Sequence, residues 1–505
     1  RFRSGLARWP RIVDRVAVTT PGAVRDALIA SNAPLITQES VFGLFTNWPQ
    51  LSARFVANAW QGTVLGALAI LLPAGLAFAT GATLVVLHLV ASLFFLANSL
   101  VRLLAAFDRP VLDNSRLDRF DPSRAPTYSI LVALYREAEI VPDLIEAMRA
   151  LQWPRPKLDI KFVCEADDAE TIAALQRGSI EGFAEIVRVP PSQPRTKPKA
   201  LNYALQLCRG DIVAIYDAED RPDPLQLVEA WQRLRAGGEA LACVQAPLDI
   251  GNGSHNRLTA LFAMEYRALF RGLLPWLARR GLLIPLGGTS NHFRRSALDA
   301  VMAWDPFNVT EDADLGTRLA RYGYRVDVIS RPTLEDAPED LGIWLKQRTR
   351  WFKGWLQTWF VHVRAPLYFI RQGGFGEFLV LQILFVGIIL SSLLHPLIVY
   401  YFVDFAVRLA DWRYTGPFDL FLAIVDGMNL VLGYGGFLAL AWRTSKRTPG
   451  IFWASAPFVP LYWLLLSAAA WRAAWQLAHA PHKWEKTPHR PHRDRTVAGA
   501  AKPVD

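Results

Sequence analysis

The hydrophobic pattern divides the chain into long apolar runs near its two ends and a polar-rich middle. Residues 61–107 carry no charged side chain before Arg102, and Thr80 and Gly81 interrupt the run near its middle. At a rise of about 1.5 Å per residue, this length matches two membrane-spanning helices joined by a tight turn. We therefore predict a helical hairpin in the membrane at this end of the chain.

Three further apolar runs lie toward the C-terminal end of the sequence. They cover residues 378–409, 418–442 and 451–480. The tail that follows is basic and rich in His, so the positive-inside rule assigns it to the cytoplasm. Three crossings after a cytoplasmic domain would place the tail outside. One run, either the first at Pro396 or the last at Pro457, is therefore expected to contain a hairpin or to lie along the membrane interface.

The middle of the chain alternates apolar runs of strand length with stretches of helical spacing. A strand is predicted at 128–134, and a helix from Glu137 to Leu151. Shorter strands are predicted at 161–164 and 211–216, and each ends in acidic residues. Buried strands that alternate with helices form mostly parallel sheets, in which ligands bind at the carboxyl ends of the strands.

The composition also favours a membrane protein. The chain has 505 residues, of which 52% are hydrophobic, and a formal net charge of +10. Lys and Arg are spread along the chain beside apolar runs, which favours a cytoplasmic membrane face over nucleic acid. The cysteines Cys164, Cys208 and Cys243 lack metal-ligand spacing and indicate thiols in a reducing compartment. No cleavable signal peptide is predicted, because the first long apolar run begins near Val64.

These patterns predict six segments. They are a cytoplasmic or interfacial segment at 1–60, two transmembrane helices at 61–107, an α/β domain at 108–335, interface helices at 336–374, three to four transmembrane helices at 375–480 and a basic cytoplasmic tail at 481–505.

Acidic residues begin a predicted helix near position 310. Thr310 is expected to be the N-cap, and Glu311 and Asp312 lie in the first turn, where the helix dipole favours negative charge. Leu315 and Leu319 follow at helical spacing. Taken alone, this pattern is typical of a capped surface helix.

Acidic residues also follow the second and third predicted strands. Asp217 and Glu219, with Asp220 beside them, can approach one cation, and clustered carboxylates suit Mg²⁺ or Mn²⁺ shared with a diphosphate. Glu165 and Asp167 follow the neighbouring strand. Carboxylates gathered at one edge repel each other unless a cation or a donor-rich ligand lies between them. The alternative for the third strand alone is an ordinary acidic turn.

Two short motifs offer hydrogen-bond donors. Lys199 lies at the start of a predicted helix, where ammonium and N–H groups suit an anion. Gly288 and Thr289 allow close backbone approach and supply a hydroxyl donor suited to a sugar. A solvated basic loop and a common Gly-rich turn are the alternatives.

An aromatic and basic motif follows about 35 residues after Asp312. On a helix, Gln347, Arg350 and Trp351 share one face. Arg350 can pair with a phosphate, and Trp351 offers a flat surface to a pyranose ring. The segment 341–360 is also expected to be an amphipathic helix at the membrane surface.

Taken in order, these motifs resemble the processive family 2 glycosyltransferases, the group of cellulose, hyaluronan and chitin synthases. The resemblance covers about residues 128–351 and depends on Asp-Ala-Glu-Asp at 217–220, Thr-Glu-Asp at 310–312 and Gln-x-x-Arg-Trp at 347–351. The usual Asp-x-Asp reads Asp-Ala-Glu here, which leaves Glu219 or Asp220 as the second metal ligand.

The resemblance implies an α/β GT-A domain inserted between membrane-spanning helices, a UDP-sugar donor and Mg²⁺ or Mn²⁺. The implied roles are Asp312 as general base beside Glu311, Asp217 with Glu219 or Asp220 as metal ligands, Glu165 or Asp167 as uridine contact, Lys199, Gln347 and Arg350 as further donor contacts, and Trp351, Gly288 and Thr289 as acceptor contacts.

The implied function is that of an inverting synthase in the bacterial inner membrane, with its catalytic domain in the cytoplasm. It would polymerise a hexose, with glucose the first expectation, into a β-linked polysaccharide and pass the product through its own helices. Residues 484–489 resemble the ending of bacterial β-glucan and exopolysaccharide synthases. The implied partners are the growing polysaccharide, membrane lipids and polysaccharide-export subunits, and no nucleic acid.

Two alternatives remain. One is the addition of a single sugar to a lipid carrier, against which the aromatic helix argues. The other is a non-catalytic export subunit with a degenerate domain. The retained, mutually repelling acids argue against that second alternative.

Overall fold

The computed structural model describes residues 21–108, 117, 120–411, 416–445, 449–481 and 485. Nearly all of the basic tail predicted at 481–505 lies outside the described residues, as do residues 1–20.

The centre of the domain is a seven-stranded sheet with the strand order β3-β2-β1-β4-β8-β6-β9. Its strands are β1 (Tyr128–Leu134), β2 (Leu158–Glu165), β3 (Ala184–Val189), β4 (Ile212–Tyr216), β6 (Leu241–Gln245), β8 (Asn291–Arg294) and β9 (Arg325–Val328). Among these strands, only β8 runs antiparallel to its neighbours. The mostly parallel sheet predicted from the sequence is confirmed.

Alternate side chains of the sheet enter two different cores. On β1, Ile130 and Val132 face one core and Leu131 faces the other, as the twofold period of a strand requires. The first core packs against the helices α5 (Val141–Ala150), α6 (Ala169–Arg177) and α8 (Gln226–Gly237). The second core packs against the helices α7 (Lys197–Leu205), α9 (Arg257–Ala268), α10 (Leu274–Arg279), α11 (Arg295–Ala300) and α12 (Glu311–Arg321).

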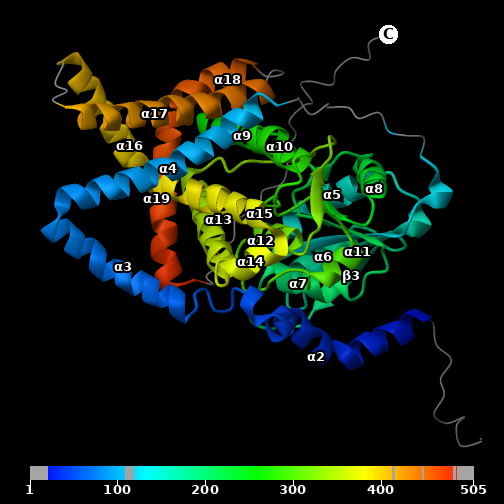
Figure 1. Ribbon diagram of the computed structural model, residues 1–505. Coiled ribbons are helices and arrows are strands. Elements are labelled where there is room, and N and C mark those ends of the chain that lie inside the picture. The colour runs from blue at the N-terminus through cyan, green and yellow to red at the C-terminus, as the bar shows by residue number, and fades with distance from the viewer. Residues whose placement is uncertain are drawn as a thin grey trace, which may run out of the picture.

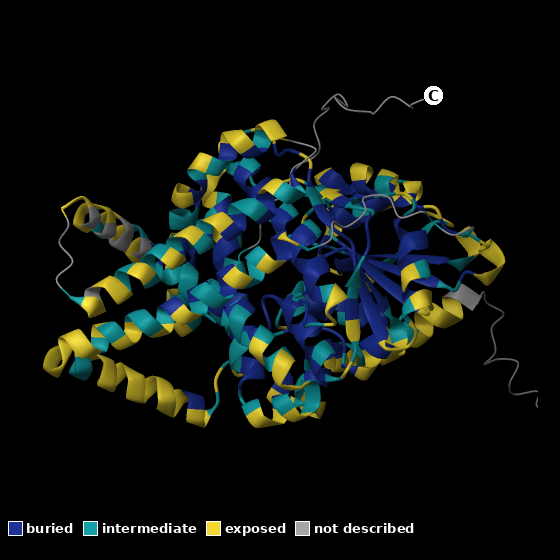
Figure 2. Ribbon diagram, turned by 45° about the horizontal axis from the view of Figure 1, so that its top comes forward, coloured by how far each residue is buried: buried dark blue, intermediate teal, exposed yellow. Residues whose placement is uncertain are grey.

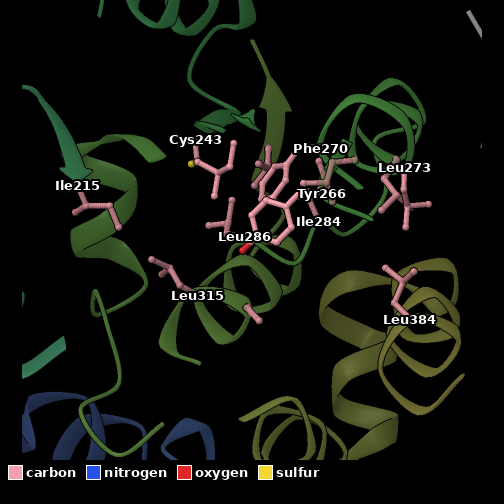
Figure 3. Close-up of a cluster of buried hydrophobic side chains, with 14 of the residues drawn as sticks. Ile215, Cys243, Tyr266, Phe270, Leu273, Ile284, Leu286, Leu315 and Leu384 are labelled. Atoms are coloured by element: carbon pink, nitrogen blue, oxygen red, sulfur yellow. The ribbon is translucent and has the colours of Figure 1, made fainter. Parts of the chain in front are cut away.

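The second core continues from the sheet into the apolar helices that flank the domain. Figure 3 shows Ile215 and Cys243 of the sheet in the same cluster as Tyr266 of α9 and Leu384 of the π-helical segment η7 (Gln382–Val386). The domain and the flanking helices therefore share one hydrophobic core, whose burial favours a fixed arrangement of the two.

A second, small sheet lies beside the first. It consists of β5 (Arg221–Pro222), β10 (Thr333–Glu335) and β7 (Leu248–Ile250), with β10 in the middle. Because β10 ends at Glu335, this sheet brings another carboxylate toward the acidic turn that follows β4.

Helices precede and follow the domain. They are α2 (Pro21–Asn47), η2 (Pro49–Leu51), α3 (Ala59–Phe78) and α4 (Thr80–Ala106) before it, and α13 (Leu341–His362), α14 (Pro366–Gly373), α15 (Phe375–Leu381), α16 (Gly387–Ala410), α17 (Pro417–Thr444), α18 (Pro449–Ser455), η8 (Ala456–Phe458) and α19 (Val459–His479) after it. The π-helical segment η6 (Leu269–Leu273) joins α9 to α10.

Five of the described helical segments are long and apolar enough to cross a membrane. They are Ala59–Phe78, Thr80–Ala106, Phe375–Leu397, Leu420–Thr444 and Pro449–His479. The α3 helix is almost wholly exposed, as Figure 2 shows, and Phe78 is 92% exposed. An apolar surface of this extent is typical of a helix that faces lipid.

The last apolar segment differs in direction from the others. In Figure 1, α4 and α17 run side by side, whereas α19 runs across them. The α19 helix packs along α13 and α16, and the Gln357 amide of α13 donates to the Pro481 carbonyl at 2.9 Å. The last apolar run is interrupted at η8, between α18 and α19. The first apolar run continues as a helix from α15 through η7 into α16.

The helix α12 makes a close backbone contact that only glycine permits. A Cβ on Gly316 would lie 2.3 Å from the Ile284 carbonyl oxygen, whereas a Cβ on Gly376 of α15 would meet nothing within 4 Å. We expect Gly316→Ala to destabilise the fold by about 1–3 kcal/mol, because the backbone must shift to admit the methyl group. Thermal unfolding in detergent checks this, with Gly376→Ala as the control that loses no stability. Equal melting temperatures for both variants would contradict the prediction.

Candidate active site

A cavity of about 950 Å³ extends from the carboxyl ends of β1, β2 and β4 to the apolar helices α4, α16 and α17. Most of the site residues expected from the sequence line this one cavity. They are Glu165, Asp217, Glu219, Gly288, Thr289, Glu311, Asp312, Gln347, Arg350 and Trp351. Asp167, Lys199 and Asp220 do not line it.

The acidic turn after β4 places a lysine against its first carboxylate. The Lys197 ammonium donates to Asp217 and, at 2.7 Å, to the Gly288 carbonyl. Burial lowers the pKa of Lys197, but Asp217 and Glu311 outweigh it, so the pKa is raised above its usual value. Lys197 therefore remains a cation beside Asp217.

The structure separates the two candidates for the second metal ligand. Glu219 lines the cavity. Asp220 is buried inside the turn, where it accepts from the Asp217 N–H at 2.7 Å and from the Thr289 hydroxyl. Burial raises the pKa of Asp220 well above its usual value, and the neighbouring carboxylates raise it further. This geometry favours Glu219 for contact with a cation.

Two of the expected donor contacts, Glu165 and Lys199, are bonded to each other. The Lys199 ammonium is fully buried and donates to Glu165 Oε1 at 2.6 Å. Glu165 Oε2 is buried without a partner among the described residues, so it is free to accept from a ligand. Asp167 is half-exposed and pairs with Arg195 at 2.7 Å. The cations that reach the cavity at this end are therefore Lys197 and Arg195.

The predicted base occupies the first turn of α12. Asp312 Oδ1 accepts from the Ala313 N–H at 2.8 Å, and its other oxygen faces Gly288, on which a Cβ would lie 3.2 Å away. Burial, and after it the charge of Glu311, raises the pKa of Asp312 to about 7. Burial also raises the pKa of Glu311, which Lys197 partly offsets. A carboxylate with this pKa is suited to accept a proton near neutral pH.

Thr310 is the N-cap residue, as predicted, but its side chain does not cap the helix. Its hydroxyl is buried and makes no hydrogen bond within the described residues. The Thr310 N–H instead donates to Asn308 Oδ1 at 3.0 Å. The helix α13 also packs closely against Thr310, since a Cβ on Gly354 would lie 2.4 Å from Thr310 Oγ1.

The helix α13 presents the aromatic motif to the cavity. Gln347, Arg350 and Trp351 line it together, as the helical spacing predicts. Gln347 Oε1 and Arg350 Nε are buried without a partner in the described structure, so a ligand can satisfy them. The Arg348 guanidinium, which also lines the cavity, lies 4.6 Å from the centre of the Trp351 ring in a cation–π contact.

Buried polar contacts fix α13 to α12. Asp314 is fully buried and accepts from Arg318 and His362, each at 2.9 Å. The Val309 N–H donates to Gln357 at 3.2 Å in the loop before α12. These contacts set the distance between Asp312 and Trp351, and they exclude Asp314 from contact with a substrate.

The end of the cavity farthest from the acidic turn, between the apolar helices, combines hydroxyl, amide and aromatic groups. Its lining includes Asn98, Ser99 and Arg102 of α4, Ser391, Ser392 and His395 of α16, Phe437 of α17 and Trp463 of α19. Polar groups interspersed with aromatic rings are suited to a ligand with hydroxyl groups and flat apolar faces, such as a sugar.

Glu335 is a lining residue that the sequence analysis did not identify. It ends β10 and lines the cavity near the acidic turn. Burial, followed by Asp220, Glu219 and Asp217, raises the pKa of Glu335 well above its usual value. A three-residue strand gives no periodicity that would have revealed it.

The residues present fit a divalent cation shared with a diphosphate. Within the described residues, no three acidic, His or Cys side chains converge closely enough to enclose a metal ion. Two protein carboxylates, from Asp217 and Glu219, are sufficient when diphosphate oxygens supply the other ligands, as is usual for Mg²⁺.

Comparison with known proteins finds a family match for this domain. Residues 125–354 match the family model described as Glycosyltransferase like family 2. The family match and the mostly parallel sheet confirm the α/β GT-A glycosyltransferase fold predicted for this part of the chain.

Two curated relatives differ in what they make. The beta-monoglucosyldiacylglycerol synthase of Trichormus variabilis is 25% identical over 46% of this chain and 50% of its own. The poly-beta-1,6-N-acetyl-D-glucosamine synthase of Staphylococcus epidermidis is 25% identical over 48% of this chain and 58% of its own. The chain thus spans about half the length of the curated relatives it matches.

A solved structure with a related arrangement is the mannosyltransferase PcManGT from Pyrobaculum calidifontis, in complex with GDP-Man and Mn²⁺. It is 18% identical, with a TM-score of 0.48, and the match covers 79% of this chain and 97% of that one.

The raised pKa of Asp312 makes a prediction about stability. A carboxyl whose pKa rises from its usual value of about 4 to about 7 on folding costs stability as pH rises through that window. We therefore expect Asp312→Asn to raise the melting temperature at pH 8.5 and to change it little at pH 4, as measured by differential scanning fluorimetry. The exposed Asp299→Asn, which loses only an ion pair with Arg295, is the control. A shift of the same size at both pH values would contradict the prediction.

Proposed function

Because residues 125–354 are a family 2 glycosyltransferase domain, we propose that the protein is a membrane-embedded, inverting synthase that polymerises a hexose from a UDP-sugar into a β-linked polysaccharide. Glucose is the first candidate for the hexose. The observation that carries this proposal is the single cavity that joins the acidic end of the sheet to polar and aromatic residues between the membrane helices.

The donor would bind at the acidic end of the cavity. Asp217 and Glu219 would hold Mg²⁺ or Mn²⁺, which when bound neutralises the charge that develops on the leaving diphosphate. Lys197 and Arg195 are the cations placed to contact the diphosphate. Glu165, with its unpartnered oxygen, is placed to accept a hydrogen bond from the uracil or ribose.

Asp312 would act as the general base. It takes the proton from the acceptor hydroxyl, whose oxygen attacks the anomeric carbon as the bond to the diphosphate breaks on the opposite face. This single displacement inverts an α-linked donor into a β-linked product. Arg350 and Lys197 lie close enough to Asp312 to lower its pKa, so they favour its charged form.

The acceptor sugar would rest against Trp351, with Gln347 and Arg350 on the same helical face. From there the cavity continues to Ser391 and His395 of α16. A product that grows from the acceptor end would enter this part of the cavity, which supports polymer synthesis coupled to passage through the helices.

The catalytic domain is proposed to lie in the cytoplasm of a bacterial cell, at the inner membrane. We place α19 along the membrane surface, because it runs across α4 and α17 and exposes Trp471 and Trp475. Exposed tryptophans are typical of the membrane interface. This arrangement gives four crossings and keeps α2 and α19 on the side of the domain.

A second candidate is the transfer of one sugar to a lipid acceptor, which the name of the Trichormus variabilis relative describes for that protein. The apolar lining residues Leu384, Ile388 and Leu466 would accommodate an acyl chain. The retained acids at the donor end argue against a non-catalytic export subunit.

Product analysis separates these functions. Membranes that contain the protein are incubated with radiolabelled UDP-glucose, UDP-N-acetylglucosamine or GDP-mannose, with Mg²⁺, with Mn²⁺ or with a chelator. Metal-dependent label in a polymer that a linkage-specific β-glycosidase degrades supports the proposal. Label that organic solvent extracts would assign the lipid function, and no transfer from any donor would refute both.

The pKa of Asp312 predicts how turnover depends on pH. We expect the rate of transfer to fall about tenfold per pH unit below about pH 7, because the protonated base cannot accept the proton, and to level off above it. Asp312→Asn is expected to lower turnover by about 10² to 10⁴-fold while UDP affinity stays within about twofold. A variant that retains normal turnover, or one that loses UDP binding equally, would remove Asp312 from this role.

The ring of Trp351 predicts a separate effect on the acceptor. We expect Trp351→Ala to weaken acceptor binding by about 1–3 kcal/mol, through loss of stacking, and to leave UDP binding intact. Acceptor-dependent initial rates and UDP titration measure the two effects, with Trp471→Ala, outside the cavity lining, as the control. Loss of UDP binding in a folded Trp351→Ala protein would place the residue at the donor instead.

A further inference from the structure

The segment between α2 and α3 packs against the loop that leads into α12. We refer to residues 48–58 as the strap and to residues 305–310, which lead into α12, as the catalytic loop. Within the strap, Leu51, Ser52 and Ala53 are buried. A connecting segment buried to this extent must satisfy its backbone groups within the protein, and its partners show what it holds.

The first partner is Asp305, at the start of the catalytic loop. This fully buried carboxylate accepts from the Ala53 N–H at 2.5 Å, from the Ser52 hydroxyl at 3.1 Å and from the Phe307 N–H of its own loop at 3.1 Å. One side chain thus fixes the backbone of the strap and of the loop together. The Arg54 guanidinium also lies 5.7 Å from the centre of the Phe307 ring.

The second partner is Arg364, two residues beyond the end of α13. Its guanidinium donates to the carbonyls of Pro49 at 3.2 Å, Gln50 at 3.1 Å and Ser52 at 3.0 Å, and also to that of Phe55. At the start of the first membrane helix, the Trp60 indole N–H donates to the Arg364 carbonyl at 2.8 Å. Arg364 therefore fastens the strap to the helix that carries Trp351.

The third side of the arrangement joins α13 to the catalytic loop. The Asn308 amide donates to Thr358 at 2.9 Å, and the Val309 N–H donates to Gln357. The loop, the strap and α13 together with Arg364 just beyond its end are thus each bonded to the other two. A closed set of three such connections resists changes in the distance between Asp312, at the end of the loop, and Trp351, on α13.

The N-terminal segment also reaches the donor end of the site. The Asn202 amide of α7, the helix that Lys197 begins, donates to the carbonyls of Ser40 in α2 at 3.1 Å and of Trp304 at 2.8 Å. Figure 1 shows α2 beneath α7 on the outer side of the domain. Displacement of α2 would therefore move both the proposed base, Asp312, and the proposed diphosphate contact, Lys197.

We propose that the strap positions the catalytic base, and that Asp305 and Arg364 are positioning residues that act through the catalytic loop. This proposal rests on the proposed role of Asp312. An arrangement that served stability alone would lower the melting temperature without changing the turnover of the folded protein. Misplacement of a base by about 1 Å can lower turnover by about 10²-fold.

The test compares Asp305→Ala and Arg364→Gln with a matched control in the full-length protein in detergent or nanodiscs. Arg294→Gln serves as the control, because Arg294 also donates to backbone carbonyls, those of Leu241 at 2.9 Å and Leu234 at 2.6 Å, and does not line the cavity. Measurements are the melting temperature, UDP affinity, initial rates of transfer and hydrogen exchange of the 305–315 backbone amides. Should Asp305→Ala fail to fold, Ser52→Ala and Asp305→Asn take its place.

We expect both strap variants to lower kcat by about 10- to 100-fold with the KM for the donor within about twofold, and to speed exchange at 305–315. Asp305→Asn, which keeps an acceptor for the Ala53 N–H, should recover part of kcat. Arg364→Lys should not, because one ammonium cannot reach all of the carbonyls to which the guanidinium donates. The control should lose melting temperature only. Folded strap variants with normal kcat and unchanged exchange would overturn the proposal. If the wild type transfers no sugar, the proposed function fails, and the exchange measurement still decides whether the strap holds the loop.

Discussion

The geometry of the site depends on the burial of one charge, that of the Asp314 carboxylate between α12 and α13. A fully buried carboxylate requires a partner, and loss of a partner typically costs about 3–5 kcal/mol. Burial would raise the pKa of Asp314, but Arg318 and His362 lower it below its usual value, so the charge persists. Burial lowers the pKa of His362 to about 4, so its ring donates as a neutral group and Arg318 supplies the positive charge. Since Asp312 lies two residues before Asp314, this contact holds the base in place.

Features that depend on local periodicity could be predicted from the sequence. The strand at 128–134 was expected from its continuous apolar run, and β1 occupies the same residues because both of its faces are covered by helices. The shared face of Gln347, Arg350 and Trp351 follows from helical spacing alone. The carboxyl ends of β2 and β4 bring Glu165 and Asp217 to one cavity, as a parallel sheet requires.

Features that depend on the direction of single side chains, or on distant contacts, could not be predicted. Lys197 and Lys199 lie two positions apart at the start of α7, and residues so spaced face different sides of a helix, so only one of them reaches the cavity. The turn after β4 likewise directs Glu219 outward and Asp220 inward. The hydrogen bond between Ala53 and Asp305 joins residues 252 positions apart. The sequence near Ala53 has no motif that predicts this contact.

The two π-helical segments described above, η6 and η7, both contribute to the cavity wall, through Phe270 and Leu384 among others. Each is a turn that contains one residue more than an α-helical turn, so the helix beyond it is rotated by about 100° relative to an uninterrupted helix. Loss of a single residue from either turn would restore the regular helix and present a different set of side chains to the cavity. The side chains that line this cavity therefore depend on the number of residues in η6 and in η7, as well as on residue type. A related chain with one residue more or fewer in either segment would enclose a different cavity.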